Sequence, residues 1–303
     1  MLAACSGNGF AVVSPQRSGV APQFLSNLHF GAASPDRRRR GTLRELAVTD
    51  FGSRAVELLN AAYKETGTIA SGLNGPDGDF IDANGNLYVA NYAGVDVSEY
   101  DKSGTQTGTY SSGLKDPVGV TVDTKGNVYV ADYGSVTASV VVEYAQGRNT
   151  PLHSCSTRLA NEGVAVDSSG DVFVSGDNTR AGGGHLLEYK GGLSGCKATR
   201  LGVTLGDAGG LQLDRKSDLV ADDQYAAVDI IPPPYTTIGS QITTAPSNFH
   251  VALNQKNNLL FIDDVNDAEV FVDKYPSGTE VTVLNSANGL SDPAGVATYP
   301  FER

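Results

Sequence analysis

Apolar residues recur along this chain in short runs that are separated by glycine, aspartate and other turn-forming residues. The clearest unit starts with GVTVD at 119–123, turns at TKG, continues with NVYVAD at 127–132 and resumes with VVVEYA at 140–145. Runs of this length suit strands, and the Asp and Gly residues between them favour tight turns. Runs such as VYVA are apolar at every position, which is typical of strands covered on both faces. The pattern predicts an all-β protein of short strands in packed sheets.

The pattern also repeats with a period of 41 residues. TGTIASGLNGPDGDFIDANGNLYVANY at 66–92 aligns without a gap with TGTYSSGLKDPVGVTVDTKGNVYVADY at 107–133, and 15 of these 27 positions are identical. Weaker copies begin near residues 161, 208 and 248. A period of about 40–50 residues with four strands per unit is typical of β-propeller blades.

The two ends of the chain carry complementary parts of one unit. RELAVTDFGSRAVELL at 44–59 has only the later part, and DPAGVATY at 292–299 has only the earlier part. The composition of 55–65 suits a helix, but its register with 96–106 predicts a strand, a turn and a strand. We therefore predict a six-bladed β-propeller of four-stranded blades, closed by pairing of the N- and C-terminal strands in one blade.

The first 40 residues are predicted to be separate from the propeller at 41–303. Leu-Ala-Ala-Cys at 2–5 resembles the lipobox of bacterial lipoproteins, which is cut before the Cys so that its thiol carries a diacylglyceryl group. No charged and apolar signal region precedes it, which indicates trimming within a signal peptide. Gly, Ser, Pro and Ala dominate the following residues, as in flexible tethers. The resemblance implies an exported bacterial protein in the periplasm or outer membrane, anchored only through Cys5. A chance tetrapeptide in a disordered tail is the alternative.

Charge and cysteine content limit the partners and the compartment. The formal net charge is −12, and because phosphate binding needs clustered Lys and Arg, nucleic acid is not an expected partner. Besides Cys5, the chain has only Cys155 and Cys196, an even pair that predicts a disulfide in an oxidising compartment. Two independent buried thiols are the alternative.

One unit carries a family resemblance. LKDPVGVTVDTKGNVYVADYG at 114–134 resembles the NHL repeat, and the similarity extends over 44–303. The units at 208 and 248 depart from it, with Ala-Gly-Gly at 208–210 and Asn-Phe-His at 248–250 in place of Pro-x-Gly. The resemblance implies a propeller similar to gluconolactonase-like and virginiamycin-lyase-like proteins. Such propellers include binding scaffolds and enzymes, so the fold alone does not decide the activity.

Oxygen-bearing side chains are predicted to converge at one mouth of the axial channel. The residue taken to close the second strand of each unit is Asp50, Asn91, Asp132, Asp177, Asp222 or Asp263. The loops that enter the first strands add Asp77, Asp116, Glu162, Asp207 and Asp292. Converging oxygens suit Ca²⁺, with Asp132, Asp222 and Asp263 as the expected ligands. The alternative is that each Asp caps a turn of its own blade and needs no ligand.

Two histidines are candidates for the same face. His250 occupies the position that glycine fills in the other units: Gly78, Gly119, Gly163, Gly210 and Gly295. A histidine beside a carboxylate at the channel mouth is a candidate general base or metal ligand, and drift in a diverged blade is the alternative. His185 follows the glycine-rich stretch 178–184 and is expected to bind ligand on this face.

Two functions remain open at this point. The first is a monomeric, non-catalytic scaffold that binds a protein, peptide, glycan or small molecule on its channel face. The second is a Ca²⁺-dependent hydrolase or lyase of the gluconolactonase-like type, with its site at the channel mouth. The sequence contains no Gly-x-Ser-x-Gly elbow and no His-Glu-x-x-His zinc pair.

Overall fold

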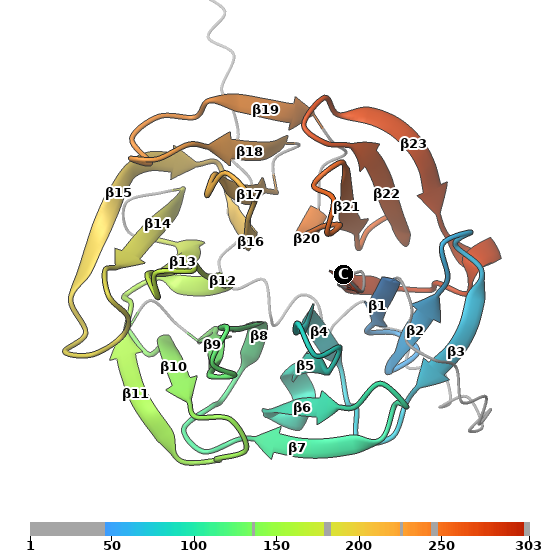
Figure 1. Ribbon diagram of the computed structural model, residues 1–303, viewed down its shortest axis with the longest axis horizontal. Helices are drawn as coiled ribbons and strands as arrows, with labels where there is room; N and C mark the ends of the chain where they lie inside the picture. Colours follow the sequence, from blue (N-terminus) through green and yellow to red (C-terminus); the bar gives the residue numbers. More distant parts are fainter. Residues whose placement is uncertain (1–45, 135–136, 179–182, 225–226, 244–247, 300–303) are drawn as a thin grey trace, which may run out of the picture.

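A computed structural model shows a closed ring of six four-stranded antiparallel sheets around a central axis (Figure 1). The structure describes residues 46–134, 137–178, 183–224, 227–243 and 248–299. Within these ranges, no helix is long and apolar enough to span a bilayer. Cys5 and the tether predicted at 1–40 lie outside the described residues, so the lipid anchor stays a prediction.

Each blade is built from four strands, which follow one another from the axis to the rim. Blade 1 contains β24, β1, β2 and β3 (Pro293–Thr298, Leu46–Asp50, Ala55–Leu59 and Glu65–Ile69). Blade 2 contains β4 to β7 (Pro76–Ile81, Leu87–Asn91, Asp96–Tyr100 and Gln106–Tyr110). Blade 3 contains β8 to β11 (Pro117–Val122, Val128–Asp132, Val140–Tyr144 and Pro151–Ser156).

The remaining blades follow the same order. Blade 4 contains β12 to β15 (Ala160–Val166, Val172–Asp177, Gly184–Tyr189 and Ala198–Leu205). Blade 5 contains β16 to β19 (Ala208–Leu213, Leu219–Asp223, Ala227–Ile231 and Ser240–Thr243). Blade 6 contains β20 to β23 (Asn248–Leu253, Leu259–Asp264, Glu269–Lys274 and Thr279–Leu284). Two 3-10 turns, η1 and η2, occupy Tyr92–Gly94 and Ser286–Asn288.

Ring closure by the two chain ends is confirmed. β24 pairs antiparallel with β1, from Leu46 opposite Thr298 to Asp50 opposite Pro293. The ambiguous segment 55–65 is β2, a turn and the start of β3, as its register predicted. The last strand of the chain thus supplies the innermost strand of the blade that the first strands begin.

Local turn chemistry follows the repeat. Asp123 Oδ1 accepts hydrogen bonds from the backbone amides of Lys125 and Asn127, each at 2.8 Å, in the turn between β8 and β9. Gly126 closes this turn at φ 84°, a conformation that glycine adopts without steric cost. Asp82 and Gly85 repeat the arrangement in blade 2.

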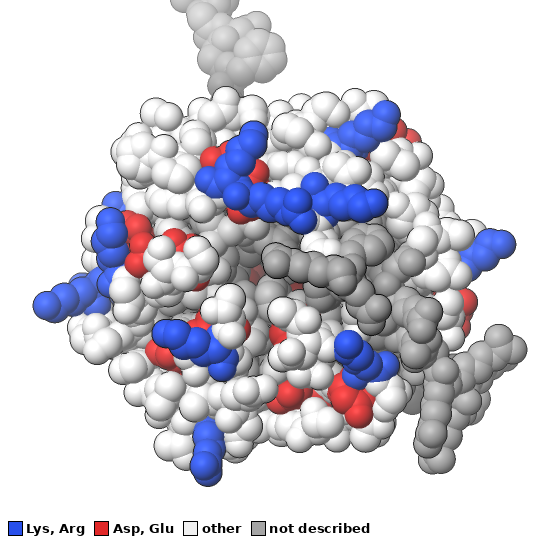
Figure 2. Space-filling model, viewed as in Figure 1, with Lys and Arg blue, Asp and Glu red and all other residues white. Residues whose placement is uncertain are grey.

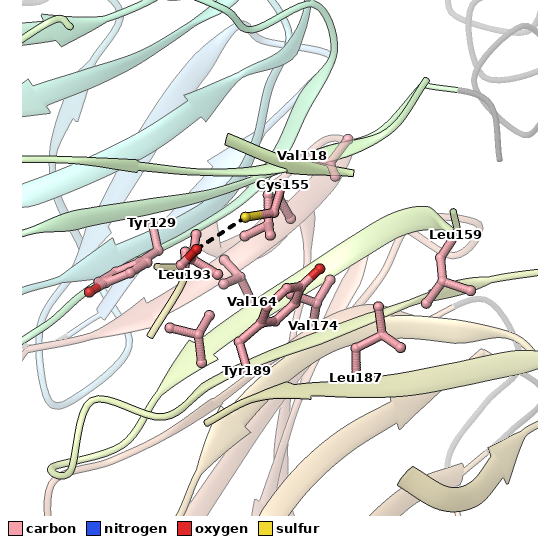
Figure 3. Packing of buried hydrophobic residues seen from close by; sticks show 12 residues of the cluster. Val118, Tyr129, Cys155, Leu159, Val164, Val174, Leu187, Tyr189 and Leu193 are labelled. Carbon is pink, nitrogen blue, oxygen red and sulfur yellow. Dashed lines mark hydrogen bonds between the residues drawn. The ribbon is translucent and has the colours of Figure 1, made fainter. Parts of the chain in front are cut away.

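Apolar side chains between neighbouring blades form the core. β9 is buried at every position, because blades cover both of its faces. In Figure 3, Val118 and Tyr129 of blade 3 belong to one buried cluster with Val164 and Tyr189 of blade 4. Burying this surface between sheets holds the blades together, at about 25 cal/mol per Å² of apolar area.

A disulfide also links blades 3 and 4. Cys155 in β11 is bonded to Cys196, which lies between β14 and β15, with the sulfur atoms 2.05 Å apart. Cys155 Sγ also lies 3.3 Å from the Leu193 carbonyl oxygen, along the dashed line of Figure 3. Since a disulfide sulfur carries no proton, this is a close contact between the two blades.

Candidate functional site

The six innermost strands form a narrow ring around the axis, and each contacts its two neighbours in that ring. Five of them have glycine at the same level. A Cβ added to any of these glycines would come too close to a backbone atom of the next innermost strand. The distance from the added Cβ would be 2.7 Å to Asp77 O for Gly295, 2.5 Å to Val118 O for Gly78, 2.8 Å to Glu162 O for Gly119, 2.7 Å to Leu211 N for Gly163 and 2.9 Å to His250 Cα for Gly210. Glycine recurs at this level because the strands approach too closely for a side chain.

His250 fills the sixth position and extends its imidazole across the axis. Its Cδ2 would lie 2.9 Å from a Cβ on Gly210, and its Nε2 would lie 2.7 Å from a Cβ on Gly78. These two glycines belong to β16 and β4, which stand on opposite sides of the six-membered ring. The side chain is only 11% exposed. His250 therefore plugs the channel at the glycine level.

The imidazole of His250 is neutral at neutral pH. Burial lowers its pKa to about 4, although the Ala294 and Val118 carbonyl groups act in the opposite direction. Nδ1 lies 3.7 Å from Asp77 Oδ1, and neither ring nitrogen has a hydrogen bond of normal geometry within the described residues. The sequence placed His250 at the channel mouth, whereas the structure places it inside the channel. This position suits a plug better than a general base, which needs access to substrate.

Carboxyl groups crowd the entry side of this plug, where the innermost strands begin. Burial, followed by the charge of Asp263, raises the pKa of Asp77 well above its usual range. Burial also raises the pKa of Glu162, with Asp177, Asp77 and Asp207 as its strongest acidic neighbours. Burial and a hydrogen bond with Asp207 raise the pKa of Asp177 to about 9. Each ionised group therefore disfavours ionisation of the next.

Two tyrosines stand beside these carboxyl groups. Burial raises the pKa of Tyr92 to about 12, and Asp116, Asp77 and Glu162 add to the effect. Burial raises the pKa of Tyr133 further, and Glu162 is its strongest acidic neighbour. We use the name entry collar for the set Asp77, Glu162, Asp177, Asp207, Tyr92 and Tyr133. It offers carboxylates, hydroxyl groups and aromatic faces at one mouth of the channel.

The predicted ring of strand-closing residues is correct in four blades and wrong by one residue in two. Asp132 pairs with Pro117 at the end of β9, and the same pairing position in blades 5 and 6 holds Asp223 and Asp264. The sequence assigned this position to Asp222 and Asp263. Because neighbouring residues of a strand face opposite sides, the two side chains point away from the predicted ring.

Four members of this ring, those of blades 1, 2, 3 and 5, cap the loops that enter their blades, whereas Asp264 caps the turn after its own strand by accepting from the amides of Asn266 and Asp267. Asp132 Oδ1 accepts hydrogen bonds from the amides of Lys115 and Asp116 at 2.9 and 2.8 Å. Matching bonds run to Asp50 from Ser291, to Asn91 from Asn74, and to Asp223 from Gly206 and Asp207. Asp177 differs, since it accepts from Ala208 of the next blade at 3.0 Å. These contacts are those of the turn-capping alternative.

The three predicted calcium ligands do not form one site, although Asp263 is the strongest acidic neighbour of Asp222. Asp132 is occupied by its entry loop, while Asp222 and Asp263 are fully buried one position deeper in blades 5 and 6. Across the described part of the chain, no group of three His, Cys, Asp or Glu side chains is placed to hold a metal ion.

His185 lies away from the channel. It belongs to β14, the third strand of blade 4, and is 1% exposed. Arg200 of β15 places its Nη2 2.7 Å from Nδ1 and 2.8 Å from Nε2 of the ring. Burial, followed by the charge of Arg200, lowers the pKa of His185. His185 therefore does not lie on the channel face, where the sequence predicted that it binds ligand.

A cavity occupies the exit side of the plug, where the innermost strands end. Its volume is about 60 Å³, and His250 lines it together with residues of all six innermost strands. Asp79 lines it as well, at the level where the other blades place Val120, Val164, Leu211, Val251 and Val296. Sequence reasoning missed Asp79, although its replacement of an otherwise apolar repeat position was a usable signal.

Charged side chains of both signs lie next to one another on the face drawn in Figure 2. Figure 2 shows Lys and Arg side chains spread around a central hollow, with Asp and Glu side chains between them.

Fold and sequence together define a six-bladed β-propeller that contains an NHL repeat. The NHL repeat family matches residues 114–137, within the unit that carried the resemblance. The propeller is similar to a chain in the crystal structure of a nidogen/laminin complex (TM-score 0.67, 15% identity, 84% of this chain and 98% of that chain covered). It is also similar to a streptogramin B lyase (TM-score 0.53, 10% identity, 80% of this chain and 74% of that chain covered). A comparison with curated protein sequences finds no match.

Proposed function

We propose that this protein is a non-catalytic binding module that receives a basic segment of a protein partner at the entry collar. The observation that carries the proposal is the crowding of half-buried Asp77 and Asp207 and buried Glu162 beside Tyr92 and Tyr133. A cationic side chain would relieve the repulsion between these carboxylates, and the tyrosine rings would add cation–π contacts with Lys or Arg. The nidogen/laminin structure supports the proposal as a similar propeller found in a protein complex.

The proposed module acts outside the cytoplasm. A lipid on Cys5 would hold it at the periplasmic or outer-membrane surface, and the Gly- and Ser-rich tether would leave the propeller free to meet its partner. Metabolic labelling with palmitate is expected to mark the protein but not its Cys5→Ser variant. Labelling of both would remove the lipoprotein part of the proposal.

One observation favours an enzyme as the second candidate. The hydrogen-bonded carboxyl pair Asp177 and Asp207 lies beside Tyr133, and burial, followed by this hydrogen bond, raises the pKa of Asp177 to about 9, so that Asp177 holds a proton at neutral pH as a general acid does. A hydrolase or lyase of this kind would act on lactones, esters or cyclic peptides. Turnover of any of these by the purified protein, lost in Asp177→Asn, would favour the enzyme over the binding module.

The binding proposal is tested with a fluorescein-labelled pentalysine peptide in a fluorescence anisotropy titration. We expect saturable binding that weakens at least fivefold in Glu162→Gln and weakens as salt is added. Asp101→Asn, a charge change in the exposed turn between β6 and β7, is the matched control and should bind like the parent. Equal binding by the Glu162→Gln variant, or equal binding of pentaglutamate, would refute the proposal.

A further inference from the structure

The exit-side cavity contains a buried carboxylate that the fold does not require. Both carboxylate oxygens of Asp79 are inaccessible to solvent and have no hydrogen-bond partner in the part of the chain that the structure describes. Five of the six blades place Val or Leu at this level, so the position packs well without a charge. Burial, followed by the charge of Asp263, raises the pKa of Asp79 well above its usual range, so the ionised carboxylate is disfavoured unless a cation compensates it.

A second unpaired polar group faces the same cavity. His250 forms its inner end, is 8% exposed, and has no hydrogen bond of normal geometry at either ring nitrogen among the described residues. Because its imidazole is neutral, it presents a lone pair and can accept a hydrogen bond. Asp79 and His250 thus offer acceptors to a donor that enters from the exit side.

We propose that the exit-side cavity binds a primary alkylammonium group, with Asp79 as its counter-ion. An ammonium group has three N–H donors, which suit a carboxylate and a neutral imidazole. The hydrocarbon walls of Val120, Val164 and Val251 suit the alkyl chain that follows it.

The chemistry of the lining excludes other ligand classes. A calcium ion needs about 6–8 oxygen ligands, and the five positions that share the level of Asp79 are all hydrocarbon. Among the described residues that line the cavity, no side chain is cationic at neutral pH, so the site has no counter-ion for an anion. A quaternary ammonium is recognised by an aromatic cage, whereas Phe80 is the one aromatic ring besides His250 among the described residues that line the cavity. The volume of about 60 Å³ holds a few water molecules, at about 10–15 Å³ each, or an ammonium group with a short chain.

The test is isothermal titration calorimetry of the full chain with n-butylammonium chloride. We expect saturable binding, no binding of n-butanol, and at least a tenfold loss of affinity in Asp79→Asn, which keeps the shape and removes the charge. Asp79→Val copies the other blades, so it should fold, melt at a higher temperature than the parent and not respond to the amine.

Three results would overturn the inference: no heat of binding with n-butylammonium, equal binding by the Asp79→Asn variant, or a response to CaCl₂ in place of the amine. Asp101→Asn, in the exposed turn between β6 and β7, is expected to bind n-butylammonium like the parent. If Glu162→Gln loses amine binding while Asp79→Asn keeps it, the amine binds in the entry collar and the exit-side site is refuted. This arm separates failure of the inference from failure of the proposed binding module.

Discussion

The imidazole of His250 reaches across the axis to Gly78, so that its Nε2 would lie 2.7 Å from a Cβ on that glycine. Gly78 and His250 occupy the same repeat position in different blades. They thus meet at the centre of the channel, where one has no side chain and the other has a ring. The glycine gives the histidine room, and the histidine closes the opening that the glycines line.

Replacing Gly78 by Ala is expected to lower the free energy of unfolding by about 1–3 kcal/mol, because the methyl group would overlap Val118 O and His250 Nε2. In the His250→Ala background the same change should cost less, since one of the two clashes is gone. Urea unfolding of the parent, both single variants and the double variant measures this coupling. Gly202→Ala is the control, because its Cβ would meet nothing closer than 3.4 Å. If the losses in the free energy of unfolding from Gly78→Ala and His250→Ala simply add in the double variant, the proposed contact between the two residues is contradicted.

A second prediction concerns pH. Burial raises the folded-state pKa of Asp263 to about 8 from its ordinary 3.8. At pH 9 the group is ionised in both states and the full cost of burying its charge is present; as pH falls through 8 the folded state takes up a proton and the cost fades. Asp263→Asn should therefore stabilise the protein by roughly 2–4 kcal/mol at pH 9, and the gain should shrink toward pH 4.

Thermal melts of parent and variant from pH 4 to pH 9 measure this difference. Asn keeps an oxygen for the hydrogen bond that Asp263 Oδ1 accepts from the His250 amide at 2.6 Å, so folding should be retained. Asp101→Asn, at an exposed turn, should show no gain that appears only at high pH. A gain that is the same at every pH would be inconsistent with a buried charge.

The repeat made the fold predictable, including the pairing of β24 with β1, because glycine, proline and aspartate recur at positions with backbone roles. The same regularity misled the site prediction in blades 5 and 6. There the doubled aspartates at 222–223 and 263–264 hide which residue closes the strand, and only the pairing of Asp223 and Asp264 settles it.

Features that depend on contacts between blades were less accessible to sequence reasoning. The sequence shows His250 as a departure from glycine, but its place inside the channel follows from how closely β16 and β4 approach its ring from opposite sides of the axis. His185 follows a glycine-rich stretch that resembles a site loop, yet its neighbour Arg200 lies on the adjacent outer strand. Sequence spacing does not report which strand of a blade faces the axis.

The link between blades 3 and 4 gives a third prediction. The Cys155–Cys196 bond spans 41 residues. Removing it raises the conformational entropy of the unfolded chain, which lowers the free energy of unfolding by about 4 kcal/mol in the chain-entropy description. The double variant Cys155→Ser/Cys196→Ser should therefore melt at a lower temperature than the parent. Dithiothreitol should lower the melting temperature of the parent toward that of the variant and leave the variant unchanged. Identical melting of parent and variant without reductant would show that the bond does not stabilise the ring.

The last prediction concerns closure. β24 covers the inner edge of β1, and the Ser291 and Asp292 amides donate to Asp50 Oδ2 at 2.6 and 3.1 Å. Deleting 291–303 should expose the backbone edge of β1, leave the carboxylate of Asp50 without these donors, and open the ring between blades 1 and 2 and between blades 1 and 6. We expect a lower melting temperature and increased light scattering on standing. Deletion of 300–303 alone removes nothing from β24 and is the control, with melting expected to be unchanged. A soluble 291–303 deletion with the melting temperature of the parent would contradict closure by this strand.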